Sequence, residues 1–405
     1  MNKRMGVLAL AALSALAGCS SHRGATTYDS TRPNPGTEGF VPLFTRLSTA
    51  TRGPLERVVA FDGFQTVGLA ISQSGRLFLS SPRWHGNHGN SVVEVFTGKM
   101  QPPASYPSPS WNAWSPGVRP ERAWVCVQAL FSDDLGRLWV LDPGAPNFQG
   151  PITGAPKLVR FTGRDKVGAS YLFDDSIAPP GSYLNDVRVD TKDGFAWISD
   201  SGLGAIVGVD LTTGRAMRFL EDHPSTKAVP GTELVIGGKV WLDASGNKPM
   251  VNCDGIALSP DGEYVYYQAL TGRDLYRVPT LAMKAALRPG EEWEGRFTGA
   301  SAMTVNDHVE PLGQTFASDA MIMDENGVLY FTALERDAIT ARLPSGELVN
   351  VAADERISWP DSLAIHGGRL YFTTARIHET GFGRPEGPFA EGPYGVFRVP
   401  LIEVE

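Results

Sequence analysis

The chain has 405 residues, of which 44 are Asp or Glu and 36 are Lys or Arg, giving a formal net charge of −8 at pH 7. This acidic balance, without a basic stripe, excludes a nucleic-acid-binding protein of the usual kind, because phosphate backbones are held by clustered Lys and Arg. The 45 Gly and 30 Pro, with ordinary apolar content, are typical of many short strands joined by tight turns.

The N-terminus has the pattern of a bacterial lipoprotein signal. After a short positive start, residues 5–17 form an almost unbroken apolar run. The run is shorter than the roughly 20 residues that span a bilayer, so it indicates a signal peptide rather than a membrane helix. Residues 16–19, LAGC, match the lipobox, in which the Cys is lipidated and becomes the mature N-terminus. We therefore expect residues 1–18 to be removed and Cys19 to carry the lipid; an ordinary secretory signal with a chance Cys is the alternative.

Residues 19–51 follow the signal and are rich in Ser, Thr, Gly, Pro and charged side chains. Such a segment buries too little apolar surface to offset the entropy lost on ordering, which predicts a flexible tether. Two or more acyl chains anchor a protein stably. We therefore expect a lipid-anchored protein of the cell envelope, in a Gram-negative cell on the outer membrane facing the periplasm or at the cell surface. Residues 52–405 remain for one folded domain, which we expect to be monomeric.

The folded part contains six copies of one hairpin pattern. In each copy an alternating apolar strand runs into a turn that ends in Gly, and a second strand with an aromatic side chain follows. The copies start at Val67, Gln128, Asp186, Asp254, Asp319 and Asp361. Their turn glycines are Gly75, Gly136, Gly194, Gly262, Gly327 and Gly368.

The repeat predicts the fold class. Small antiparallel sheets that cannot bury both faces alone are stabilised by closing into a ring, so we predict an all-β, six-bladed β-propeller. Residues 55–61 precede the first copy and are expected to close the ring by pairing with the last blade. Residues 281–287 are expected to form a short connecting helix. The competing interpretation is a seventh blade built from residues 106–123.

Polar side chains recur where the innermost strands begin, at one mouth of the predicted channel. They are Gln128, Asp186, Asp254, Asp319 and Asp361, with Asn185 one position earlier and Val67 in the first copy. Two unit charges about 5 Å apart repel by roughly 3 kcal/mol at an effective dielectric of about 20. A cation, raised pKa values, or intervening water and backbone amides must therefore relieve this set. A purely structural role, in which each Asp bonds neighbouring amides, is the alternative.

Three further features concern the chemistry of this mouth. An all-oxygen set of side chains suits Ca²⁺ or Mg²⁺ better than zinc or copper. His308, in the segment TVNDHVEP before the fifth copy, is expected to reach the mouth. Cys126 and Cys253 either pair in an oxidising compartment or remain as buried thiols.

Six segments in chain order carry a family resemblance. They are Ser81–Trp84, Tyr106–Trp111, Gly136–Gly144, Ala196–Ser201, Leu275–Val278 and Ser318–Met321. They resemble the successive motifs of the yellow/major royal jelly protein family, over about residues 55–400. The resemblance implies a six-bladed propeller, secretion and a small-molecule pocket in the channel mouth. Animal members include dopachrome-converting enzymes, biogenic-amine binders and proteins with no settled activity.

A second resemblance involves the same mouth. Asn185-Asp186, Asp254–Gly262 and Asp319 are similar to segments of the regucalcin/gluconolactonase propellers that carry metal ligands and catalysis. That resemblance implies Asn185, Asp254 and Asp319 as metal ligands, with Asp254 as the base. The first ligand in that family is a Glu opening the first blade; this chain has Val67 there, and Asp254 stands where an Asn is usual.

Three functions are consistent with these residues. The first is a tautomerase or isomerase of a small cyclic carbonyl compound, in which a channel carboxylate, Asp254 or Asp319, is the general base. The second is a lactonase in which Ca²⁺ or Mg²⁺ polarises the carbonyl. The third is a binding protein without turnover that captures a small amine or aromatic compound. The residues expected to contact the ligand are Gln128, Asn185, Asp186, Asp361 and His308.

Overall fold

The computed structural model describes residues 53–86, 88–98, 101–163, 165–289, 305–380 and 393–403. All of them belong to the unit formed by Arg46–Glu405. The predicted signal peptide, the lipidated Cys19 and the tether lie outside the described residues. Within the described ranges, no helix combines the length and the apolar character needed to cross a membrane.

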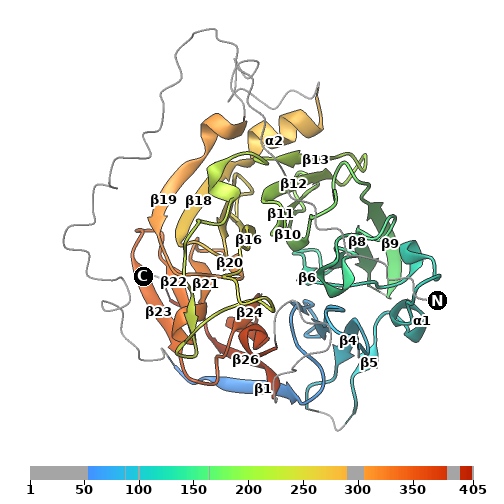
Figure 1. Ribbon diagram of the computed structural model, residues 1–405, viewed down its shortest axis with the longest axis horizontal. Helices are drawn as coiled ribbons and strands as arrows, with labels where there is room; N and C mark the ends of the chain where they lie inside the picture. The colour runs from blue at the N-terminus through green and yellow to red at the C-terminus, as the bar shows by residue number, and fades with distance from the viewer. Residues whose placement is uncertain are drawn as a thin grey trace, which may run out of the picture. The chain divides into compact units, whose positions relative to one another are not determined.

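Six antiparallel sheets of four strands each form the ring in Figure 1, with the strands of the first five in chain order. Blade 1 comprises β2 (Leu69–Ile71), β3 (Leu77–Ser80), β4 (Val92–Val95) and β5 (Ala104–Ser105). Blade 2 comprises β6 (Ala129–Ser132), β7 (Leu138–Asp142), β8 (Lys157–Thr162) and β9 (Lys166–Leu172). Blade 3 comprises β10 (Leu184–Asp190), β11 (Phe195–Asp200), β12 (Ala205–Asp210) and β13 (Ala216–Phe219). Blade 4 comprises β16 (Cys253–Leu258), β17 (Tyr264–Ala269), β18 (Asp274–Pro279) and β19 (Glu310–Gln314). Blade 5 comprises β20 (Met321–Met323), β21 (Leu329–Ala333), β22 (Ala338–Arg342) and β23 (Leu348–Ala353).

Blade 6 is built from both ends of the chain. Its strands are β24 (Pro360–His366), β25 (Arg369–Thr374), β26 (Tyr394–Pro400) and the N-terminal β1 (Glu56–Phe61). Figure 1 shows β1 beside β26, and the pairing aligns Glu56 with Arg398, whose side chains form an ion pair of 2.6 Å. The six-bladed propeller and its closure by residues 55–61 are therefore confirmed.

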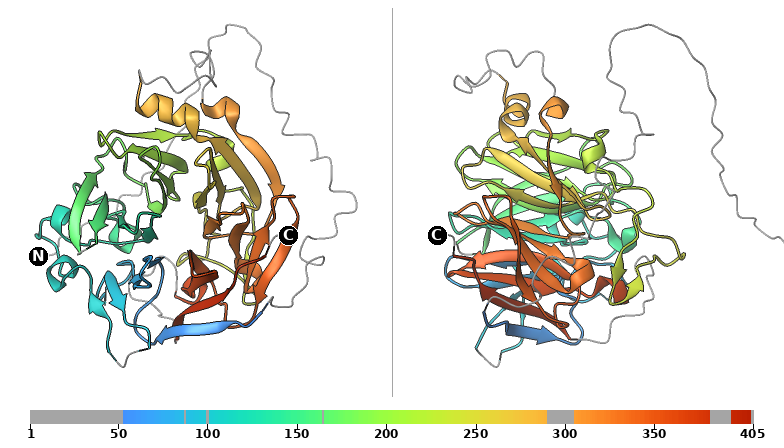
Figure 2. Two further views of the ribbon diagram at one scale, coloured as in Figure 1. Left: turned by 180° about the vertical axis from the view of Figure 1, so that it is seen from behind. Right: turned by 90° about the vertical axis from the view of Figure 1, so that its left-hand side faces the viewer.

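The segments between blades form short elements. Residues 106–123 contain α1 (Pro109–Asn112) and η2 (Pro120–Arg122) and no strand, so the seventh blade is not formed. The predicted connecting helix is α2 (Thr280–Leu287), which contacts β12 and β13 at the outer rim of the ring (Figure 2). A small hairpin of β14 (Val235–Ile236) and β15 (Lys239–Val240) lies between blades 3 and 4 in the chain.

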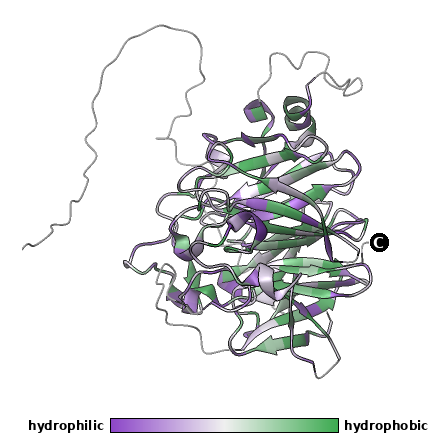
Figure 3. Ribbon diagram, turned by 90° about the vertical axis from the view of Figure 1, so that its right-hand side faces the viewer, coloured by the Kyte–Doolittle hydropathy of each residue, from purple (hydrophilic) through white to green (hydrophobic). Residues whose placement is uncertain are grey.

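The core lies between neighbouring blades, where the inner strands of the sheets are buried, whereas outer strands such as β9 are largely exposed. Every residue of β10 and of β11 is buried. One apolar cluster joins blades 2 and 3 through side chains that include Trp139, Val187 and Ile198. Figure 3 shows the apolar positions concentrated along the strands. Period-two alternation therefore places one set of side chains against each neighbouring blade.

The innermost strands β2, β6, β10, β16, β20 and β24 contact one another around the channel. Three of them begin with a β-bulge, in which three residues of the inner strand lie opposite two residues of its partner in the pairing register. The bulges lie between Leu184 and Val187, between Cys253 and Ile256, and between Pro360 and Leu363. A bulge bends the strand and re-aims its side chains, so these bulges set the direction of the predicted site residues.

Candidate functional site

A cavity of about 300 Å³ lies at the mouth where the innermost strands begin. Five polar side chains of its lining stand at the start of the innermost strands of blades 2 to 6, and they are Gln128, Asn185, Asp254, Asp319 and Asp361. All five were predicted from the repeat, and all five are less than a tenth exposed. The structure therefore brings three acidic side chains and two amides from five different blades into one small space.

Asp254 lies between two of these groups. The side-chain amide nitrogen of Asn185 donates a hydrogen bond of 2.5 Å to Oδ1 of Asp254. Asp254 and Asp319 also share a side-chain hydrogen bond. An ionised carboxylate only accepts hydrogen bonds, so one member of this pair must carry a proton.

Burial keeps protons on this cluster. The pKa of Asp254 lies well above its ordinary value, because the group is buried and because Asp319, Asp361 and Asp186 surround it with negative charge. Burial and the negative charges of Asp319 and Asp186 raise the pKa of Asp361 well above its usual range. Burial also raises the pKa of Asp319, to about 7, against the lowering effect of hydrogen bonds from the Trp359 indole and from Asp254. Asp319 is thus the member of the pair that ionises more readily.

Asp186 is not in the lining of the cavity, although its position in the repeat predicts it there. The bulge in β10 presents Asn185 to the cavity instead. The carboxylate of Asp186 binds the guanidinium of Arg188 at 2.8 and 3.0 Å, and Arg188 also donates to the carbonyl of Met321 in blade 5. Arg188 lines a second cavity, of about 530 Å³, at the turns where the inner strands end.

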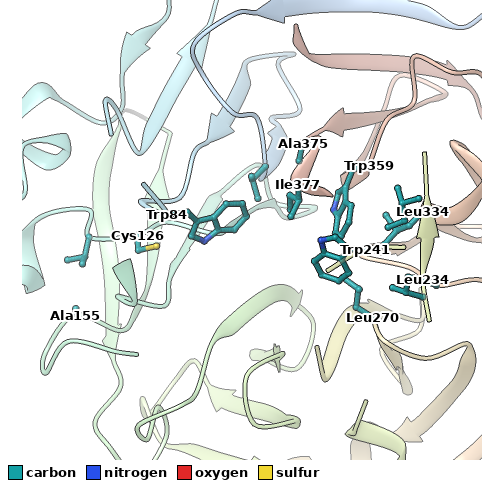
Figure 4. Packing of buried hydrophobic residues seen from close by; sticks show 14 of the residues in the cluster. Trp84, Cys126, Ala155, Leu234, Trp241, Leu270, Leu334, Trp359, Ala375 and Ile377 are labelled. Atoms are coloured by element: carbon teal, nitrogen blue, oxygen red, sulfur yellow. The ribbon is translucent and has the colours of Figure 1, made fainter. Parts of the chain in front are cut away.

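Aromatic rings form the walls of the mouth cavity. Trp241 and Trp359 pack edge to face with ring centres 4.8 Å apart, and Figure 4 shows Trp84 opposite them. Trp84 stacks on Phe148 and donates its indole N–H to the hydroxyl of Tyr183 at 2.8 Å. Among the described residues that line the cavity, none is Lys, Arg or His. The cavity thus combines flat apolar walls with acidic groups that no basic side chain of its lining neutralises.

The predicted metal set does not fit this arrangement. Asn185 turns its amide nitrogen, a donor, towards Asp254, and Asp254 is bonded to Asp319 instead of being splayed around a common point. Within the described residues, no group of three or more His, Cys, Asp or Glu side chains is arranged to hold a metal ion. Val67, where the lactonase resemblance requires a Glu, is fully buried in an apolar cluster. Asn185, Asp254 and Asp319 form a hydrogen-bonded row and not a Ca²⁺ or Mg²⁺ cage.

Two other predictions are settled by position. His308 ends η5 (Val305–His308), which contacts β18, the third strand of blade 4 counted from the channel, and is not among the lining residues. The structure therefore does not place His308 at the mouth. Cys126 and Cys253 are both free and buried, so of the two alternatives the unpaired thiols are the ones found.

The sequence did not predict the aromatic side chains that form the walls of the cavity. Trp241 and Tyr183 belong to segments between blades, which carry no repeat and hence no positional signal. The position of Trp359 at the mouth could have been predicted, because it stands two residues before Asp361, where the last repeat starts. Trp84 closes the motif Ser81–Trp84, which was noticed for its resemblance and not for its position at the mouth.

Comparison with known proteins gives the family. The family model described as "Major royal jelly protein" matches residues 125–381, which is more than half of the chain. The chain belongs to the major royal jelly protein family. The match to the family spans Gln128, Asn185, Asp254, Asp319 and Asp361, so every polar residue of the cavity lies inside it.

Solved structures similar to this family member are propellers of low sequence identity. They include a virginiamycin B lyase from Staphylococcus aureus (12% identity, TM-score 0.47, covering 86% of this chain and 99% of that chain). A gluconolactonase from Xanthomonas campestris is 13% identical, with a TM-score of 0.45 and coverage of 88% and 98%. A luciferin-regenerating enzyme is 11% identical, with a TM-score of 0.49 and coverage of 86% and 96%. No curated protein matches the chain.

Proposed function

We propose that this family member is an isomerase of the tautomerase type, which transfers a proton within a small cyclic carbonyl compound held in the mouth cavity. The observation that carries the proposal is the buried, hydrogen-bonded pair of Asp254 and Asp319 in the cavity lining. A pair that shares one proton contains one acid and one base. Proton transfer within a substrate requires both.

The roles follow from the protonation of the pair. Asp319, as the carboxylate, takes a proton from the carbon next to the substrate carbonyl, while Asp254 donates its own proton to the carbonyl oxygen. The conjugated enol then returns its hydroxyl proton to Asp254, and Asp319 delivers its proton to a different ring carbon. Every proton taken is given back, so the step needs neither an oxidant nor water. Walls of Trp84, Trp241 and Trp359 exclude water, which strengthens these charge interactions.

The experiment that tests the proposal needs no known substrate. Solvent deuterium incorporation is followed by NMR for a panel of cyclic enones and quinone-type compounds, dopachrome among them, with and without the chain. We expect the chain to accelerate exchange at a carbon next to the carbonyl in at least one compound. Exchange at the background rate throughout the panel would overturn the proposal.

A second function, capture of an aromatic amine, is supported by the acidic lining. An ammonium group is stabilised both by carboxylates and by the faces of aromatic rings. The pKa of Asp361 and of Asp254 is raised by burial, so an entering cation should expel protons from the cavity.

The prediction for amine capture is therefore specific. By calorimetry, phenethylamine should bind more tightly than the corresponding neutral alcohol, with a heat that varies with the ionisation enthalpy of the buffer. Asp361→Asn should weaken amine binding by about 10-fold, the worth of one hydrogen bond to a charged group. Asp134→Asn, at the opposite mouth, is the matched control and should bind normally. Equal affinity for amine and alcohol contradicts cation capture.

We further propose a monomeric, lipid-anchored protein of the cell envelope. The support is the N-terminal sequence, in which a short apolar run ends in the lipobox LAGC with Cys19. Cys19→Ser is expected to move the protein from the membrane fraction to the soluble fraction and to abolish incorporation of labelled fatty acid. Cys126→Ser removes a buried thiol elsewhere and should leave both readouts unchanged. Membrane association and labelling that persist in Cys19→Ser would contradict the lipid anchor.

A further inference from the structure

Trp359 has a backbone conformation that bulky residues rarely adopt. Its φ of +48° lies in the left-handed region, and its side chain is only 1% exposed. Such a conformation costs about 1–3 kcal/mol and persists where surrounding contacts hold it. It immediately precedes Pro360, the first residue of β24, and Asp361, which lines the cavity.

The contacts of Trp359 hold its indole ring in one orientation. The indole N–H donates a hydrogen bond of 2.7 Å to Oδ2 of Asp319, across the boundary between blades 6 and 5. Trp241 packs edge to face against one side of the ring, and His378 stacks on it at 5.8 Å with an interplanar angle of 12°. The backbone carbonyl of Trp359 accepts from the N–H of Ala375 at 2.9 Å. Figure 4 shows Trp359, Trp241 and Ala375 gathered on one side of the cavity.

We propose that Trp359 is a positioning residue that determines which carboxyl of the Asp254–Asp319 pair holds the shared proton. A donor fixed on Oδ2 of Asp319 favours the ionised form of that group, because hydrogen bonds to a charged acceptor are roughly twice as strong as neutral ones. The proton then stays on Asp254, whose Oδ1 accepts from Asn185. Each oxygen of the pair keeps a partner whichever carboxyl holds the shared proton, so it is the strength of the indole bond to an ionised Asp319 that favours Asp254 as the acid and Asp319 as the base. The acid and base roles in this inference rest on the proposed function, whereas the position of the proton rests on the hydrogen bonds of Trp359 and Asn185.

Of the other charged groups near the pair, only Asp361 acts on one member and not on the other. Asp186 and Asp361 raise the pKa of Asp254, and Asp186 also raises that of Asp319. Arg188 is bound to Asp186 and lines the second cavity. On the far side of the indole, burial lowers the pKa of His378, which keeps that ring neutral near pH 7. The indole N–H lowers the pKa of Asp319 and Asp361 raises that of Asp254, so both contacts favour the proton on Asp254.

The test is Trp359→Phe in the full folded domain, which keeps an aromatic ring and removes the donor. We expect the ionisation of Asp319, followed by carboxyl ¹³C NMR without substrate, to move upward by about 1–2 pH units. The acidic limb of the exchange rate, which the ionisation of the base Asp319 sets, should move upward with it. Trp84→Phe is the matched control, because its indole N–H donates to Tyr183 in the same cavity, and it should leave the carboxyl titration unchanged. An unchanged titration in Trp359→Phe overturns the inference.

A measurement on the unmodified chain covers the case in which Trp359→Phe does not fold. Among the nine tryptophan indole N–H signals, one should shift with the same midpoint as the Asp319 carboxyl, and this shift should vanish in Asp319→Asn. If no indole signal follows the carboxyl, the inference fails. If the carboxyl titration behaves as expected but the chain exchanges no substrate proton, the position of the proton is upheld and the tautomerase proposal is refuted. The failure of this inference and the failure of the proposed function are therefore distinguishable.

Discussion

Asp319→Asn is expected to slow proton transfer to substrate by about 100-fold or more, the usual contribution of a general base. The substitution keeps the shape of the side chain and an oxygen that accepts the Trp359 indole N–H, so the cavity should persist. It removes the carboxylate that takes up the substrate proton. Binding of a non-reacting ring compound should therefore change far less than the exchange rate.

The pH dependence of the same reaction follows from the pKa of Asp319. That pKa is raised to about 7, chiefly by burial, so the base is protonated and inactive in acid. For the unmodified chain, kcat/KM should rise with pH up to about 7 and then level, before Asp254 loses its proton at higher pH. Asp134→Asn is the control of equal charge change and should keep both rate and profile. A rate in Asp319→Asn within a few-fold of the unmodified chain contradicts its role as base.

Asp254→Asn is expected to stabilise the folded domain above pH 7. A buried carboxyl with a raised pKa binds its proton in the folded state and loses it when unfolded, so its contribution to stability is present at low pH and is lost as pH rises through the folded pKa. Asp254, Asp361 and Asp319 all have raised pKa values, which sets this window above the ordinary value of 3.8. Asparagine is neutral at every pH and retains a partner for the Asn185 amide. We expect a gain of about 1–2 kcal/mol at pH 8, equivalent to one or two pKa units.

The measurement is the free energy of unfolding in urea at pH 5 and pH 8. Asp133→Asn is the matched control, because the buried Asp133 carboxylate accepts from the Trp139 indole, from Arg137 and from backbone amides. In Asp133→Asn the amide nitrogen, which is a donor, would face N–H groups that are also donors. The substitution should therefore destabilise the folded domain by about 1–3 kcal/mol at both pH values. If Asp254→Asn destabilises the domain at pH 8 as Asp133→Asn does, the cluster is a structural hydrogen-bond network and holds no excess protons.

The sequence predicts the fold and most of the carboxyl cluster for a physical reason. A ring of repeated hairpins places equivalent residues at equivalent heights, so counting back from each turn glycine finds Asp254, Asp319 and Asp361 at one mouth. The count fails at Asp186 because Gly194 stands one residue later in its turn than Gly262 does, and the strand registers make Asn185 the equivalent of Asp254. Asn185, its neighbour, takes the lining position.

The remaining features depend on contacts between segments far apart in the chain. The hydrogen bond from Trp359 to Asp319 spans 40 residues, and the Trp84 indole reaches Tyr183 across 99 residues. No periodicity marks such pairs. His308 fell outside the site for the same reason, since its distance from a repeat in sequence says nothing of its distance from the channel. The residue types of the predicted metal set do not reveal which atom of the Asn185 amide faces Asp254, and only the structure supplies that orientation.

The shared proton of Asp254 and Asp319 is tested most directly by carboxyl ¹³C NMR of the folded domain, titrated from about pH 3 to pH 9 without substrate. The predicted result is two coupled aspartate resonances that remain partly protonated at neutral pH, with Asp319 ionising near pH 7 and Asp254 above it. Asp319→Asn should remove one resonance and shift the other. If both carboxyls ionise near the ordinary aspartate value of about 4, the pair holds no proton at neutral pH and the acid–base function is contradicted.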